Sequence, residues 1–219
     1  MANTRNTRPI ERSVLSEVVK DQILQWIMEG ELEPGARIVE TRVARDLGTS
    51  QAPVREALRD LAAQGFVEMR PHQGARVRQP TMEELTEAIE VRAELEALAG
   101  RLAAERRTDQ CLVDLEDLFV AMQEAADRGD AHDHAVMNTR FHARIVDAAH
   151  NRTLGRLWSM LEPFSRTYFT ATAPGVDLQW LADRHQGILD AIRDRDPDRA
   201  EQILRNHALE VTTALVVDD

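Results

Sequence analysis

A pair of arginines on a predicted helix is the first feature of this sequence that could bind another molecule. Arg55 and Arg59 stand four residues apart in the stretch SQAPVREALRDLAAQGF, beside a stripe of small and aliphatic side chains. Residues four apart share one face of a helix, so both guanidinium groups should lie together. A guanidinium can bind a guanine edge or a phosphate of nucleic acid. Alternatively, the two arginines form a solvated face that pairs with Glu56 and Asp60.

Histidines in the second half of the chain form another candidate set. Asn138 and His142 lie four apart in MNTRFHARI, and His185 and His207 belong to two later segments. Neutral imidazoles suit zinc, nickel, copper or iron, and three of them with one oxygen would leave positions open for water or a ligand. The spacing alone also fits histidines at the surface or in a hydrogen-bonded core. That second interpretation applies as well to His132, His150 and His134, the last of which stands one turn before Asn138.

A lone arginine interrupts an apolar helix stripe further along the chain. Position 92 falls on the predicted buried face of the helix that follows Thr81, yet it is occupied by Arg92. A buried guanidinium needs an anionic partner. Glu96, one turn on, or an acid on another helix would make an internal salt bridge. The carboxylate of a bound ligand is the alternative partner.

Length, composition and charge limit which elements can position these residues. The 219 residues are 43% hydrophobic, which is enough for one large core or two modest ones. The chain has no apolar run of membrane-spanning length, and MANTRNTRPIERS lacks the apolar centre of a signal peptide, so we expect a soluble cytoplasmic protein. Net charge is -11, but residues 1–80 hold 12 Lys+Arg against 11 Asp+Glu. This asymmetry predicts two domains with different partners, and only the first is suited to nucleic acid.

The first third of the chain predicts helices followed by a hairpin. Helices are expected over Val14–Met28, over about Glu40–Leu47 and after Ser50, which can cap the third helix. The segment FVEMRPHQGARVRQ alternates apolar and polar residues around a Pro71 to Gly74 turn, as a hairpin does. This order is that of a winged helix-turn-helix, whose second paired helix enters the major groove of DNA.

The winged helix-turn-helix architecture assigns roles to the polar residues of this region. Arg55 is placed to bind guanine, and Gln51 could read adenine, while the other residues are expected at phosphate or wing contacts. The predicted DNA-binding set is Arg42, Ser50, Gln51, Arg55, Arg59, Arg70, His72, Gly74 and Arg76. A flexible basic arm with Arg5, Arg8 and Arg12 is a further candidate contact.

From Thr81 onward the sequence predicts helices only. Thr81 and Glu84 form a capping box at the start of a long helix that should end near Arg107. Further helices are expected at about Asp109–Arg128, Asp133–His150, Thr153–Ala171 with a bend near Pro163, Leu178–Arg195 and Pro197–Val216. Six such helices with short connections form an antiparallel bundle. We therefore predict a mainly α protein, with a winged helix-turn-helix domain at residues 1–78 and a helical bundle at residues 79–219.

Two parts of the sequence resemble known families. LGTSQAPVREALRDLAAQGFVEMRPHQGARV resembles the DNA-binding domain of the GntR family of bacterial transcription regulators, and the resemblance covers about residues 12 to 78. It rests on the PVREAL core, the GFV step and the GARV wing. Family members often carry arginine where this chain has Gln51, a departure that concerns base preference.

The second resemblance covers residues 81 to about 216. VRAELEALAGRLAAER, NTRFHARIVDAAHNRTL and DRHQGILDAIRDRDPDRAEQILRNHAL resemble the FCD ligand-binding domain of the FadR branch of GntR regulators. The resemblance implies a divalent transition metal, with zinc or nickel expected first, bound by Asn138, His142, His185 and His207. It also implies that Arg92 holds an organic acid against the metal. Asn138 replaces the commoner aspartate, which removes a negative charge and should favour an anionic ligand.

These features predict a ligand-responsive transcription regulator rather than an enzyme. We expect a homodimer on a pseudo-palindromic operator in double-stranded DNA. The resemblance implies a repressor that a small carboxylate releases. Apolar residues on the helix from Asp109 to Arg128, namely Leu112, Leu115, Leu118 and Phe119, could supply bundle core and a dimer contact together. Two alternatives remain. Three histidines with an open position also describe a metal-dependent hydrolase, and the bundle could merely dimerise a constitutive DNA-binding protein.

Overall fold

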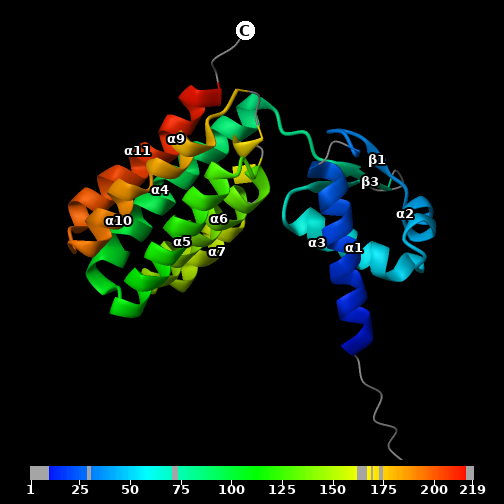
Figure 1. Ribbon diagram of the computed structural model, residues 1–219, viewed down its shortest axis with the longest axis horizontal. Coiled ribbons are helices and arrows are strands. Elements are labelled where there is room, and N and C mark those ends of the chain that lie inside the picture. The colour runs from blue at the N-terminus through cyan, green and yellow to red at the C-terminus, as the bar shows by residue number, and fades with distance from the viewer. Residues whose placement is uncertain are drawn as a thin grey trace, which may run out of the picture. The chain divides into compact units, whose positions relative to one another are not determined.

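The computed structural model describes residues 10–28, 31–70, 74–161, 167–168, 170–172 and 175–215 of the chain. The chain divides into two compact units, Met1–Gln79 and Pro80–Asp219, which we call the head and the body. Figure 1 shows a small sheet with helices in the head, and the described helices and strands of the body are all helices. The predicted fold class, a winged helix-turn-helix with an all-helical bundle, is confirmed.

Six elements build the described part of the head. They are α1 (Ile10–Met28), β1 (Arg37–Ile38), α2 (Glu40–Asp46), α3 (Gln51–Ala63), β2 (Val67–Arg70) and β3 (Gly74–Val77). The strands form an antiparallel sheet in the order β1-β3-β2, with Arg37 opposite Arg76 and Val67 opposite Val77. Strand β1 was not predicted, because two residues are too few for an alternating pattern and their strand geometry depends on pairing with β3.

The core of the head explains why α3 keeps its polar face outside. Val54, Leu58 and Leu61 of α3 are buried, together with Ile23 of α1 and Phe66. The stripe predicted for α3 is therefore correct, and the third- and fourth-residue spacing that produced it leaves the arginines of that helix in solvent.

Two local predictions for the head were wrong. Ser50 occupies the N-cap position of α3 in an extended conformation, but its side chain makes no capping hydrogen bond. Helix α1 begins at Ile10, so the backbone of Arg12 is helical and does not belong to an arm. Arg5, Arg8 and the side chain of Arg12 lie outside the described part of the chain.

The body consists of helices in its described part. They are α4 (Met82–Arg106), α5 (Asp109–Asp127), α6 (Ala131–Ala148), α7 (Arg152–Ser159), α9 (Leu178–Asp183), α10 (Gln186–Arg193) and α11 (Pro197–Leu215). The predicted capping box is confirmed, because the Glu84 N–H donates to Thr81 Oγ1 at 3.2 Å and the Thr81 N–H donates to Glu84 Oε2 at 3.1 Å. The predicted bend near Pro163 lies outside the described residues.

The single helix predicted over Leu178–Arg195 is two helices, α9 and α10, and the chain turns between them at Arg184 and His185. The backbone N–H of His185 donates to the Ala182 carbonyl at 3.0 Å, three residues back instead of four. The same carbonyl lies 3.1 Å from His185 Nδ1. This tight turn sets the ring of His185 into the bundle, where it is buried.

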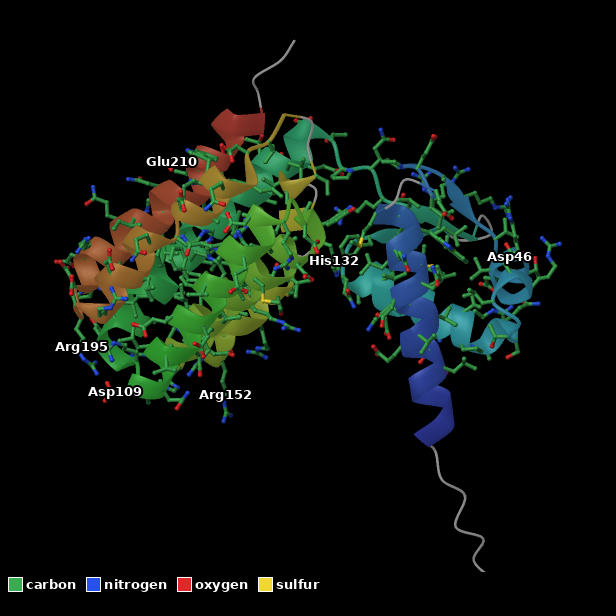
Figure 2. All side chains as sticks on the ribbon, viewed as in Figure 1. Asp46, Asp109, His132, Arg152, Arg195 and Glu210 are labelled. Atoms are coloured by element: carbon green, nitrogen blue, oxygen red, sulfur yellow. The ribbon has the colours of Figure 1, made fainter. Side chains whose placement is uncertain are left out.

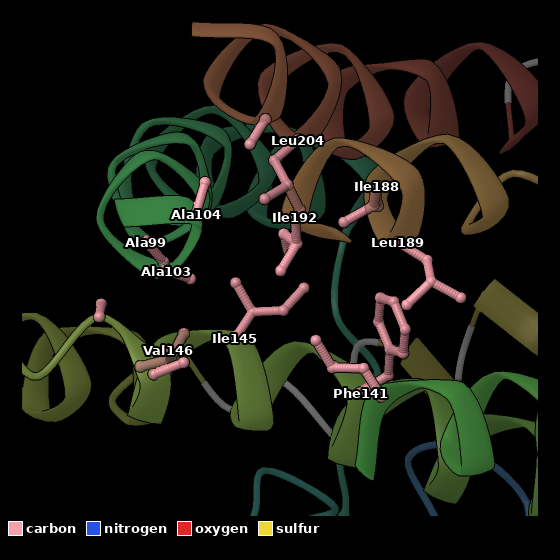
Figure 3. Packing of buried hydrophobic residues seen from close by; sticks show 14 of the residues in the cluster. Ala99, Ala103, Ala104, Phe141, Ile145, Val146, Ile188, Leu189, Ile192 and Leu204 are labelled. Carbon is pink, nitrogen blue, oxygen red and sulfur yellow. The ribbon is translucent and has the colours of Figure 1, made fainter. Parts of the chain in front are cut away.

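The body core takes buried side chains from α4, α5, α6, α7, α9, α10 and α11, and Figure 3 shows part of it. Ile192 and Leu204 pack there against alanines of α4 and against Ile145 of α6. The approach of α11 to α4 is close, since a Cβ at Gly100 would lie 2.2 Å from Leu204 Cδ1. Small residues on α4 thus permit the helix contact that positions its neighbouring polar residues.

The apolar face predicted for α5 is divided between the core and its edge. Leu115 and Phe119 are buried, and Leu112 and Leu118 pack partly buried against the core. The apolar side chains that α5 exposes are instead Val113 and Val120. The predicted contribution of these residues to the bundle core is confirmed, and a dimer contact through α5 stays a prediction.

Charged side chains cover the outside of the body. In Figure 2, Asp109, Arg152 and Arg195 project at one end of the bundle and Glu210 at the other. Arg195 Nη2 donates to the Arg107 carbonyl at 3.2 Å, which ties two helix connections together at that end. None of the described helices is long and apolar enough to cross a lipid bilayer.

Candidate functional site

The exposed face of α3 carries the principal charged group of the head. Gln51, Arg55 and Arg59 all lie in solvent. Arg55 Nε donates to Glu40 Oε2 at 2.6 Å, and Arg55 Nη2 donates to Gln51 Oε1 at 3.1 Å. Glu40 is the first residue of α2. The guanidinium of Arg55 is thus held in one direction on the surface while part of its donor capacity remains unused, because an arginine has five N–H groups.

The remaining predicted DNA contacts differ in their availability. Arg42 and Arg70 are exposed and lie beside acids, 3.6 Å from Asp46 and 2.9 Å from Glu68 respectively. Ser50 and Gly74 are exposed as well. Arg76 instead is half-buried, and its Nη1 donates to the Gly35 carbonyl at 2.9 Å. It supports the loop before β1, a role that the alternation pattern did not reveal. His72 lies outside the described residues.

In the body, the tertiary structure brings the four predicted metal ligands together. Asn138 and His142 come from α6, His185 from the turn before α10 and His207 from α11, and all four are buried. One ligand atom from each histidine lies within 4.8 Å of the other two. His185 Nε2 is 3.2 Å from His142 Nε2 and 3.3 Å from Asn138 Nδ2. A half-turn of the amide would bring Asn138 Oδ1 to the same point, since the two ends of an amide exchange places.

The far nitrogens of two imidazoles face acceptors. His142 Nδ1 lies 3.1 Å from Glu96 Oε2, although the two atoms are not aligned for a linear hydrogen bond. His185 Nδ1 faces the Ala182 carbonyl. When both Nδ1 atoms carry the proton, the two Nε2 lone pairs oppose each other. A cation between them would remove that repulsion, and such backing of metal-binding histidines by a carboxylate or carbonyl is common.

Burial keeps the imidazoles of His185 and His207 neutral. It lowers the pKa of His185 and His207 well below the ordinary histidine value, and the neighbouring histidines add to the effect. Neutral imidazole is the form that binds a metal ion. Three imidazole nitrogens and one amide oxygen therefore fit a divalent transition metal, and none of these donor groups is an anion that would compensate the charge of the ion.

Glu96 is a central residue that the sequence analysis considered only as a partner of Arg92. It is 1% exposed, and its Oε1 accepts from Arg92 Nε at 2.6 Å and from Trp158 Nε1 at 2.9 Å. Burial by itself would raise the pKa of Glu96, but the charge and hydrogen bond of Arg92, with His142 close by, hold that pKa well below its usual range. The internal salt bridge, one of the two alternatives for Arg92, is present. The sequence signal for the central position of Glu96 was an acidic residue one turn after Arg92 on an otherwise apolar helix face.

A cavity of about 30 Å³ adjoins the histidines. Arg92 and Arg184 line it together with His134, Asn138 and Thr167, and among its described lining residues none is a carboxylate. Arg184 was not predicted, and its position directly before His185 was the only signal in the sequence. Its Nη2 also donates to Glu210 Oε2 at 3.0 Å and to the His207 carbonyl. Two arginines beside a neutral metal-ligand set give this cavity an affinity for anions.

Comparisons with known proteins match both units. Residues 15–77 match the family described as bacterial regulatory proteins, gntR family, and residues 87–210 match the FCD domain. A probable D-xylose utilization operon transcriptional repressor from Paenarthrobacter nicotinovorans is 39% identical over 92% of this chain and 88% of its own length. The regulator McbR of Escherichia coli (strain K12) is 28% identical over 85% of this chain and 86% of its own length.

Solved structures have the same fold. The structure of E. coli McbR/YncC has a TM-score of 0.73 at 26% identity and covers 92% of this chain and 96% of its own. A putative GntR regulator from Rhodococcus sp. RHA1 also has a TM-score of 0.73, at 20% identity, with coverage of 94% and 97%. The second likeness concerns the fold alone.

Proposed function

We propose that this protein represses transcription until its body binds a small carboxylate. The proposal proceeds from its family, because the chain belongs to the gntR family of bacterial regulatory proteins and carries an FCD domain. That it is a DNA-binding regulator of transcription, and not an enzyme, follows from the family and its relatives, which sets the hydrolase alternative aside. The observation that carries the effector proposal is that three buried imidazoles converge beside a cavity lined by two arginines.

For DNA binding, we assign base reading to Arg55 and Gln51 on α3. Glu40 holds the Nε of Arg55, so the side chain is already ordered before it meets DNA. Such ordering lowers the entropy lost on binding. Contacts to phosphate, or to the DNA groove that the wing enters, are assigned to Arg42, Ser50, Arg59, Arg70, His72 and Gly74. Arg76 would act mainly by supporting the wing. A homodimer would place two α3 helices in successive major grooves, ~34 Å apart, on a pseudo-palindromic operator.

For metal binding, we assign Asn138 Oδ1, His142 Nε2, His185 Nε2 and one nitrogen of His207 as ligands. Zinc or nickel suits this donor set. When bound, the ion supplies a Lewis-acidic centre with open positions. Glu96 would act as a positioning residue that keeps the proton of His142 on Nδ1, and Arg92 and Trp158 fix Glu96 in turn.

For the effector, we assign the carboxylate to Arg92 and Arg184 on the cavity wall. Arg92 gives one N–H to Glu96, so it retains donors for an anion. An organic acid from sugar breakdown is the class to screen first, because two relatives are named as repressors of a D-xylose utilization operon and of a gluconate operon. Such a ligand shifts the protein away from its DNA-binding state only by its preference for one conformation.

The DNA assignment is tested by selecting a preferred operator from random duplexes and replacing Arg55 by alanine. The variant should lose roughly 5- to 150-fold in affinity for the selected operator, the usual range for a bidentate base contact, and much less for random DNA. Arg152→Ala, an exposed arginine of the body, is the matched control. Equal losses on both DNAs would mean that Arg55 contacts phosphate only.

The metal and effector assignments are tested by thermal unfolding of the full chain with zinc or nickel, followed by small carboxylates. The metal should raise the unfolding temperature of the body, and a bound acid should raise it further. His185→Ala should abolish both shifts, whereas His150→Asn, which changes an exposed histidine, should keep them. DNA affinity that ignores metal and acids alike would favour the alternative of a constitutive DNA-binding dimer.

A further inference from the structure

Two side chains hold Arg55 on the surface of the head. Its Nε donates to Glu40 Oε2 at 2.6 Å, and its Nη2 donates to Gln51 Oε1 at 3.1 Å. Gln51 and Arg55 lie four residues apart on α3, and a long side chain on a helix leans toward the N-terminus, so the guanidinium reaches back over Gln51. Glu40 holds it from the start of α2. The three residues form a clamp between α2 and α3.

The next arginine of α3 has no such clamp. Arg59 is exposed one turn further on, and within the described part of the chain it has neither a hydrogen-bond nor a salt-bridge partner. A free arginine can follow a phosphate from several directions. A base edge instead presents two acceptors in one direction, which a fixed guanidinium matches. The clamp therefore distinguishes Arg55 from Arg59 before either residue meets DNA.

The clamp leaves Arg55 enough donors to read a base. A guanidinium has five N–H groups, and Glu40 and Gln51 each accept from one of them, on Nε and on Nη2. Both N–H groups of Nη1 and one of Nη2 remain. A bidentate contact with guanine O6 and N7 uses two of these. The two bonds thus fix the direction of Arg55 without using up its donors.

The bond to Arg55 restricts what Gln51 itself can bind. An amide reads adenine through both its ends, because its oxygen accepts from the N6 amino group while its nitrogen donates to N7. Here Gln51 Oε1 already accepts from the guanidinium. An adenine amino group at that oxygen would bring its own N–H against the N–H groups of a cation. Reading adenine would therefore cost Arg55 one of its two tethers.

We infer that the contribution of Gln51 to base reading passes through Arg55, so that Gln51 is a positioning residue with no base contact of its own. This inference rests on the proposed function, namely that Arg55 reads a base of the operator. Gln51 acts through its acceptor oxygen, which keeps the guanidinium in the reading direction. It thereby lowers the entropy that Arg55 loses when it binds a base.

Operator selection with the full chain and its variants tests this role. Random duplexes are enriched with the unchanged protein, and the base pair at which Arg55→Ala loses its preference is the one that Arg55 reads. Affinities for this operator and for its single-base changes are then measured by fluorescence anisotropy at one salt concentration. Gln51→Leu removes the acceptor and should lower the preference at that same base pair by roughly 2- to 12-fold, the cost of ordering one long side chain.

Two further variants separate the acceptor of the amide from its donors and from the helix. Gln51→Glu keeps an acceptor for Arg55 Nη2 but loses both N–H groups, so the preference at the base pair of Arg55 should be retained. Its affinity for all duplexes should fall together, because the added negative charge repels phosphate. Gln64→Leu makes the same chemical change as Gln51→Leu at the C-cap of α3 and should alter no preference.

The outcomes distinguish the role of Gln51 from the base contact of Arg55. Loss of preference at a second base pair in Gln51→Leu, or no loss at any, would overturn the positioning role. Equal losses of preference in Gln51→Leu and Gln51→Glu would also overturn it, because the amide N–H groups would then matter instead of the oxygen. Equal losses of Arg55→Ala on operator and random DNA would overturn the proposed base contact of Arg55 itself, and the role of Gln51 with it.

Discussion

The head and the body each contain an arginine–glutamate pair with nearly the same geometry. Arg55 Nε lies 2.6 Å from Glu40 Oε2 in the head, and Arg92 Nε lies 2.6 Å from Glu96 Oε1 in the body. The head pair is 55% and 26% exposed, whereas the body pair is 13% and 1% exposed. Water competes for the first pair and is excluded from the second. The same contact is therefore a weak surface tether in one unit and a structural requirement in the other.

The difference extends to the other polar groups of the two units. The head packs an apolar core and keeps its charged residues on α3 in solvent, where they can meet phosphate and bases. The body encloses Glu96, His134 and the three clustered histidines. Its polar side chains lie inside, where the proposed small ligand would bind. Six of the chain's seven histidines belong to body residues, so acid and metal ions should act on the body first.

The largest expected effect comes from breaking the buried pair. Glu96→Ala should lower the free energy of unfolding of the body by about 3–5 kcal/mol, because it leaves the charge of Arg92 uncompensated and Trp158 Nε1 without its acceptor. Urea unfolding monitored by circular dichroism measures the loss. Glu96→Gln, which keeps an acceptor, should cost less. A loss below about 1 kcal/mol for Glu96→Ala would mean that burial does not distinguish the two pairs.

Acid should produce the next largest effect, again in the body. The folded-state pKa of His134 is about 4, below its ordinary value of 6.5, because burial disfavours the charged ring. Between these values the unfolded chain binds a proton that the folded chain does not. Stability should therefore fall as the pH drops, by about 2 kcal/mol from pH 6.5 to 5 at the usual ~1.4 kcal/mol per unit.

Thermal unfolding of the metal-free protein across this pH range measures that slope. The buried His185 and His207, whose pKa values are also lowered, should make it steeper. His134→Phe should make it shallower, whereas replacing the exposed His150 by asparagine should not change it. A slope in His134→Phe equal to that of the unchanged protein would contradict the assignment of this pH dependence to His134.

The smallest effect is expected from the exposed pair. Glu40→Ala should change the free energy of unfolding by less than about 1 kcal/mol, because solvent already screens its contact with Arg55. A double-mutant cycle with Arg55→Ala isolates the interaction. Its energy should vanish in 1 M salt, where the Debye length is ~3 Å. A coupling that survives such salt would place this pair in the same class as Arg92 and Glu96.

Most of the head could be predicted from local patterns. The apolar spacing of Val54, Ala57, Leu58 and Leu61 located both the buried face of α3 and, by exclusion, its charged face. The exceptions were features that depend on distant residues. Strand β1 exists through its pairing with β3, and Arg76 bonds the Gly35 carbonyl far back along the chain.

In the body, the sequence and the tertiary structure determined different features. By itself, the amino-acid sequence determined the helices, the capping box at Thr81 and, through family resemblance, which histidines to consider together. The tertiary structure decided that Glu96 meets Arg92, His142 and Trp158, that the chain turns at His185, and that His134 and Arg184 line one cavity. Helical periodicity tells which face of a helix is buried. It carries no information on which distant groups that face meets, and those neighbours decide whether a buried polar residue is charged, neutral or ready to bind a ligand.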